Sequence, residues 1–121
     1  MKKYDKKTMK KLRELGAIAY ERELDQALSE LDASFKQWRA KEIDGFELSD
    51  LIHKFHDGKS RDLYKYYHRA NPEMAVSRAL VLKILRQSEI PANVYEQIAE
   101  LLKFFKADFE EDTTSPIKNV L

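Results

Sequence analysis

The sequence has no cysteine, and only three of its 121 residues are glycine and three are proline. Without cysteine the chain has no disulfides, no thiolate ligands for zinc and no cysteine nucleophile. Long hydrophobic runs are also missing, because uncharged stretches such as residues 90–95 are far shorter than the ~20 residues that span a bilayer. We therefore expect a soluble protein of the reducing cytoplasm that makes no contact with a membrane.

Catalytic motifs are missing as well. The three glycines are too far apart to form GxGxxG or a P-loop, and no serine lies in a GxSxG motif. The net charge of +1 provides no overall field for binding nucleic acid. The sequence therefore identifies no catalytic residue and no cofactor, and it favours a binding role over an enzyme.

The residues that are present are mostly helix formers, and 36% of the chain is charged. No run alternates between apolar and polar residues as a half-buried strand would. The sequence predicts an all-α protein, a five-helix bundle with a long N-terminal helix and a flexible C-terminal tail. Residues 1–109 are expected to form a single helical domain, and residues 110–121 a flexible acidic and polar tail.

Residues 5–41 contain no proline and no turn cluster, so they are predicted to form the long helix. At 1.5 Å per residue this helix would be about 54 Å long, whereas a compact chain of this size is about 35 Å across. The helix must therefore project from the molecule or break at Gly16. One apolar stripe follows helical spacing along its second half: Leu24, Leu28, Leu31, Phe35 and Trp38.

Three further apolar residues of this helix, Leu12, Leu15 and Ile18, lie off that stripe. A projecting helix with apolar side chains on more than one side needs a cover, which a second copy or another protein can provide. We therefore expect a binding or regulatory role through protein–protein association, as a homodimer or with a different protein. The predicted association surface comprises Leu12, Leu15, Ile18, Leu24, Leu28 and Leu31.

Four shorter helices are predicted after the long one. Residues 46–69 look like two helices hinged at Gly58, because Asp57-Gly58 is typical of a helix stop with glycine in the left-handed region. Asn71-Pro72 starts the next helix, which is apolar on most sides up to about Gln87 and should be the most buried element. Ile90-Pro91 precedes the fifth helix.

Residues 47–67, with the sequence ELSDLIHKFHDGKSRDLYKYY, resemble a segment of small uncharacterised all-helical bacterial proteins. The resemblance covers about a sixth of the chain. It implies a bacterial, cytoplasmic protein, and it brings no assigned activity, substrate or catalytic residue.

A metal site is the first alternative, because residues 46–69 contain all three histidines. His53, His56 and Asp57 lie on one flank of their helix, and His68 would join them if the chain folded back at Gly58. Such ligands suit zinc, iron or manganese in a metal-dependent enzyme or a metal-binding protein. However, HKFH lacks the i, i+4 spacing of HEXXH, so surface histidines are the simpler interpretation.

Nucleic-acid binding is the second alternative. Basic residues alternate with tyrosines in the same segment and could contact phosphates beside stacked bases: Lys59, Arg61, Lys65 and Arg69. Against this, Leu63 and Tyr67 have the spacing of a core face, and the chain as a whole is nearly neutral.

Overall fold

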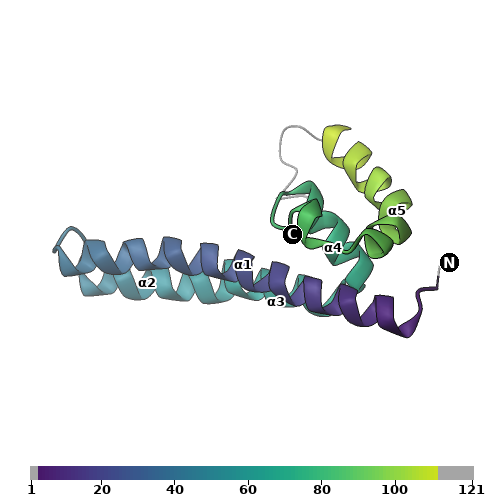
Figure 1. Cartoon of the computed structure of the whole chain (residues 1–121). Helices are drawn as coiled ribbons and strands as arrows, with labels where there is room; N and C mark the ends of the chain where they lie inside the picture. The colour runs from purple at the N-terminus through teal and green to yellow at the C-terminus, as the bar shows by residue number, and fades with distance from the viewer. Residues whose placement is uncertain (1–2, 112–121) are drawn as a thin grey trace.

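The computed structural model describes residues 3–111, and residues 110 and 111 only as backbone. A long helical hairpin dominates its shape (Figure 1). One side of the hairpin is α1 (Lys6–Arg39), and the other is built from three consecutive elements: α2 (Gly45–Phe55), η1 (His56–Ser60) and α3 (Arg61–Arg69). The predicted all-α class is confirmed.

The remaining helices form a head that packs on the N-terminal half of α1 (Figure 1). It consists of α4 (Pro72–Val81), a short 3₁₀ turn η2 (Gln87–Glu89) and α5 (Ala92–Glu111). Residues 24–60, the part of the hairpin beyond the head, project as what we call the arm. The predicted tail, residues 110–121, lies outside the described residues except for the last two backbone positions of α5.

Helix α1 continues through Gly16, so the alternative of a break there is wrong. Gly16 is buried, and a Cβ built on it would lie 4.0 Å from the Cβ of Ala75 in α4. The glycine therefore lies where α1 and α4 pack together, and its backbone is ordinary helix. At 34 residues α1 is about 51 Å long, and it projects beyond the head as the length argument required.

The predicted hinge at Gly58 is wrong, and so is the count of five separate helices. No glycine among the described residues has a positive φ, so Gly58 does not form a left-handed stop. A π-helical turn, His56–Ser60, joins α2 to α3, and the residues on either side of it, Phe55 and Arg61, are right-handed. Four helical rods result, because α2, η1 and α3 form a single one.

The substitution Gly58→Ala should raise the free energy of unfolding by about 0.5–1 kcal/mol. The backbone is right-handed, and an added Cβ would have no neighbour within 4 Å. Urea denaturation followed by circular dichroism measures the change. Gly45→Ala is the control: Gly45 is the first residue of α2, where helix propensity counts less. A left-handed hinge would give the opposite sign, a loss of stability.

Local signals explain where most helices begin. Asp44 and Glu47 form a capping box at the start of α2, in which Asp44 Oδ1 accepts a hydrogen bond of 2.8 Å from the Glu47 amide. Pro72 is the first residue of α4, and Pro91 immediately precedes α5, as predicted. By contrast, α4 ends at Val81 and not near Gln87, because Lys83 adopts a left-handed φ of 63°.

The main core lies where α1, α4 and α5 meet. Helix α4 is its centre, as predicted, since residues 75–79 are all buried. The cluster is almost entirely aliphatic: Leu12, Leu15, Ala19, Val76, Ala79, Leu85, Ile90, Val94 and Ile98. Within residues 3–111, no helix combines the length and apolar character needed to cross a bilayer.

Candidate association surface

A buried ion pair holds the hairpin to the head. Glu23 of α1 and Arg78 of α4 form two parallel hydrogen bonds of 3.0 Å, from Arg78 Nη1 to Glu23 Oε2 and from Nη2 to Oε1. Tyr67 of α3 donates a third hydrogen bond, of 2.6 Å, to Glu23 Oε2. Arg78 is completely inaccessible to solvent. Helices α1, α3 and α4 are thus joined at this ion pair. Removing one member of a buried ion pair leaves the other charge buried without a partner, which strongly lowers stability.

Aromatic rings enclose this junction. The Arg78 guanidinium lies 4.6 Å from the centre of the Tyr66 ring, and Tyr67 stacks on Tyr20 with ring centres 4.7 Å apart. Burial and the hydrogen bond to Glu23 raise the pKa of Tyr67, so its hydroxyl stays protonated and remains a donor. Burial alone would lower the pKa of Arg78, but the hydrogen bonds and charge of Glu23 outweigh it and raise that pKa. The clamp thus joins one ion pair with the neutral hydroxyl of Tyr67 as an additional hydrogen-bond donor.

A second clamp lies at the surface beside the first. Arg22 donates to the backbone oxygen of Ile84 at 2.9 Å and forms a two-point ion pair with Glu89, with distances of 2.8 and 2.6 Å. Hydrogen bonds from Arg22 and from the Arg86 amide lower the pKa of Glu89 to about 2. The segment that follows α4 is therefore attached to α1, which sets the angle between head and arm.

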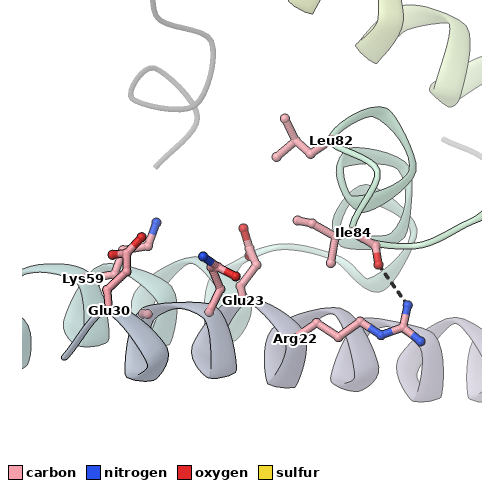
Figure 2. Close-up of a pocket in the computed structure, with 8 residues that line it drawn as sticks. Arg22, Glu23, Glu30, Lys59, Leu82 and Ile84 are labelled. Atoms are coloured by element: carbon pink, nitrogen blue, oxygen red, sulfur yellow. Dashed lines mark hydrogen bonds between the residues drawn. The ribbon is translucent and has the colours of Figure 1, made fainter. Parts of the chain in front are cut away.

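A cleft of about 340 Å³ occupies the angle between head and arm (Figure 2). Leu82 and Ile84 line it from the segment that follows α4, whereas Gln26, Glu30 and Lys59 line it from the arm. Figure 2 shows Glu30 and Lys59 at one end of the cleft and Arg22 with Ile84 at the other. The arm thus directs polar side chains, Gln26, Glu30 and Lys59, toward the head, and we call this side the crook face.

The opposite side of the arm carries large apolar side chains. Ala27 is buried and Ser34 is half-buried, and the next residue in each case, Leu28 and Phe35, lies about 100° further round α1. On α2, Ile52 follows the half-buried Leu51 and likewise lies about 100° further round its helix. In an antiparallel pair of helices these equivalent flanks lie on one side, so Leu28, Phe35 and Ile52 together define what we call the outer face.

The outer face has no cover within the described chain. Leu28 is 44% exposed and Ile52 is 38% exposed, while Phe35 is half-buried. Two large side chains at the end of the arm, Trp38 and Phe46, are also exposed. Half of the large exposed apolar residues of the described chain thus belong to an arm that is only two helices thick.

The predicted association surface is therefore divided. Leu12 and Leu15 are buried against α4 and α5, so their assignment to that surface is wrong. Ile18 is exposed but lies on another side of α1, near the head. The other three predicted residues belong to the arm, where Leu28 is on the outer face and Leu24 and Leu31 are half-buried beside it.

The histidines do not come together. His53 and His68 lie on one continuous rod, about 22 Å apart along its axis, because the fold-back at Gly58 does not occur. His68 instead stacks on Tyr64, with ring centres 3.9 Å apart. Among residues 3–111 no group of three or more histidine, aspartate or glutamate side chains could hold a metal ion, so the predicted set of His53, His56, Asp57 and His68 is wrong.

The four basic residues separate into two places. Arg61, Lys65 and Arg69 are exposed and follow each other at four-residue steps along α3, so they share one face of that helix. Lys59 lies elsewhere, in the cleft of the crook face. Nucleic-acid binding by this reduced set stays a prediction.

Sequence reasoning missed the Glu23–Tyr67–Arg78 clamp. One signal was present, because Arg78 is the only charged residue between Glu73 and Lys83 in an otherwise apolar helix. A charge in such a position needs a buried partner. Which of the many acidic residues provides it depends on how α1 packs against α4, and no local pattern encodes that.

Comparisons with protein-family models, with curated proteins and with solved structures found no match. The resemblance of residues 47–67 to a segment of bacterial helical proteins and the cytoplasmic location both stay predictions. Any statement about function therefore has to come from the surfaces described above.

Proposed function

We propose that the protein is a binding protein that associates through the outer face of its arm, and that the first partner to consider is a second copy of the chain. The observation that supports this is the uncovered apolar side of the arm, with Leu28 and Ile52 both well exposed. Two helices can bury one seam between them, but side chains beside that seam remain in water. A second hairpin placed on this side would complete a four-helix bundle.

The rest of the molecule suits a role of this kind. The clamps at Arg78 and Arg22 hold the arm at a fixed angle to the head, so its outer face is presented in advance and needs little ordering on binding. The crook face bears the charged side chains Glu30 and Lys59. Association through one face of the arm leaves the head free for further contacts, together with the basic face of α3 formed by Arg61, Lys65 and Arg69.

The substitution Leu28→Asp tests the proposal. We expect the wild-type chain to sediment at twice the mass of one chain at high concentration, and the variant at the mass of one chain. The reason is that a carboxylate placed in the middle of an apolar contact would be buried without a partner. Analytical ultracentrifugation over a range of concentrations measures the effect, with circular dichroism to confirm that the variant is folded.

Met74→Asp is the matched control. Met74 is 39% exposed, close to the 44% of Leu28, but it lies in α4 on the head. This variant should keep the wild-type mass. A wild-type chain that stays monomeric at every concentration would remove the proposed self-association, and so would a Leu28→Asp variant that dimerises normally.

A further inference from the structure

Charged side chains are arranged in opposite sign at the two ends of the outer face. Two rows on α1 repeat every seventh residue and lie next to each other: Glu21, Leu28 and Phe35 form the first, and Asp25, Asp32 and Arg39 the second. Acidic side chains, Glu21 and Asp25, thus mark the end nearer the head. The far end is basic.

The basic end consists of Arg39 together with Lys36, which is exposed on the adjoining side of α1. Lys36 pairs with Asp32 at 3.3 Å, and both side chains are more than half exposed, so this ion pair is worth little. The salt bridges formed among the described residues do not involve Glu21, Asp25 or Arg39. The apolar centre, Leu28 and Phe35 with Asp32 beside them, therefore lies between an acidic and a basic end, and Glu21, Asp25 and Arg39 are in no ion pair among the described residues.

From this pattern we propose that the partner on the outer face is a second copy of the chain running antiparallel, with a two-fold axis close to Leu28 and Leu31. This inference rests on the proposed function and specifies its geometry. A two-fold axis there places Leu28 of each chain near Leu31 of the other. It also brings the acidic end, Glu21 and Asp25, opposite the partner's basic end, Lys36 and Arg39.

The opposite arrangement is disfavoured by the same charges. If α1 instead lay parallel against α1 of the second chain, Glu21 would face the same residue of that chain, and Arg39 would too, so like charges would meet at both ends. Exposed pairs contribute only about 0.2–1 kcal/mol each, so the apolar centre supplies most of the affinity and the charges select the orientation. The antiparallel contact is also self-complementary, as a two-fold dimer requires.

Disulfide cross-linking can test the orientation cleanly, because the chain has no cysteine of its own. Glu21→Cys and Arg39→Cys are prepared as separate proteins, one carrying a mass tag, and are oxidised singly and as a mixture. A disulfide forms only when the two Cα atoms are within about 7 Å. In the antiparallel dimer, identical positions 21 or 39 lie about 27 Å apart along the axis, whereas position 21 faces position 39.

The expected result is a mixed disulfide between the two proteins and little dimer from either alone. Homodisulfides at both positions would indicate that α1 runs parallel to α1 of the partner and would overturn the inference. Absence of any cross-link, in a protein that Leu28→Asp converts to a monomer, would also overturn the orientation while leaving the proposed function in place. A wild-type chain that is monomeric by ultracentrifugation would remove both.

Charge reversal provides a second readout that needs no oxidation. The pair Glu21→Lys with Asp25→Lys should raise the dimer dissociation constant about tenfold, because each reversal acts at both ends of a two-fold interface. Adding Lys36→Glu and Arg39→Glu to the same chain restores opposite charges and should recover most of the affinity. Reversal that has no effect on the dissociation constant would contradict the proposed pairing.

Discussion

Replacing Arg78 by alanine should lower the free energy of unfolding by about 3–5 kcal/mol. The guanidinium is completely buried, and its removal would leave the Glu23 carboxylate at the junction with only the Tyr67 hydroxyl as a hydrogen-bond donor. Breaking a buried ion pair on one side costs far more than breaking an exposed one. Urea denaturation followed by far-ultraviolet circular dichroism provides the measurement.

Two further variants show whether the lost pair is the cause. Lys54→Ala removes an ion pair with Asp50 in which both side chains are more than half exposed, and should change stability by less than about 1 kcal/mol. The double variant Glu23→Met with Arg78→Met removes both charges and should recover part of the loss, because no buried charge is left alone. A cost near that of Lys54→Ala would show that the clamp does not hold the fold.

The substitution Leu12→Ala should cost about 2–5 kcal/mol, which is the range for deleting most of a fully buried leucine side chain. Leu12 has no solvent exposure and packs in the aliphatic core beneath α4 and α5. The measurement is the same denaturation series, with chain mass determined in parallel. The loss should appear in the stability of the single chain.

Ile18→Ala is the control on the same helix. Ile18 is 40% exposed, so its truncation should cost clearly less than that of Leu12. If Leu12 belonged instead to an association surface, its truncation would weaken the dimer and leave the folded single chain nearly as stable. That outcome would reverse the assignment made from the structure.

The sequence was sufficient to predict elements whose signals are local. The long first helix, the starts at Pro72 and after Pro91, and the burial of the helix containing Val76 all follow from composition, helical spacing and proline positions. Helix propensity and the absence of turn residues allowed a continuous helix through Gly16, but the sequence did not decide between this and a break at Gly16. One glycine in a helix interior costs only about 1 kcal/mol, which does not by itself break a long helix.

The predicted association residues show why the apolar pattern of one helix does not identify the residues of an interface. Leu12 and Leu28 are equally hydrophobic and lie on the same helix, and nothing in their immediate neighbours says which of them the head will cover. That choice depends on contacts between α1 and α4, some 60 residues apart in the chain. For the same reason the sequence does not identify the partner of Arg78, although it does indicate that this buried charge needs a partner.

The error at Gly58 has a different origin. Asp57-Gly58 interrupts the apolar spacing of α2, and a broken spacing normally indicates the end of a helix. A π turn is the less common way to accommodate the same interruption, because it holds one residue more per turn than the α-helix around it. Such a turn has no strong sequence signature, so the more frequent outcome was predicted.

The π turn sets the rotational phase of the second rod. In an uninterrupted α-helix, Leu63 would be rotated by about 100° relative to its observed side, because every residue adds that angle. The additional residue absorbs the difference, so Leu48 of α2 and Leu63 of α3 both face α1 and are both buried. Tyr67 follows Leu63 by four residues and is carried to Glu23 by the same correction. Five residues in the middle of the second rod thus align α2 with α3 and bring the tyrosine hydroxyl to the buried ion pair.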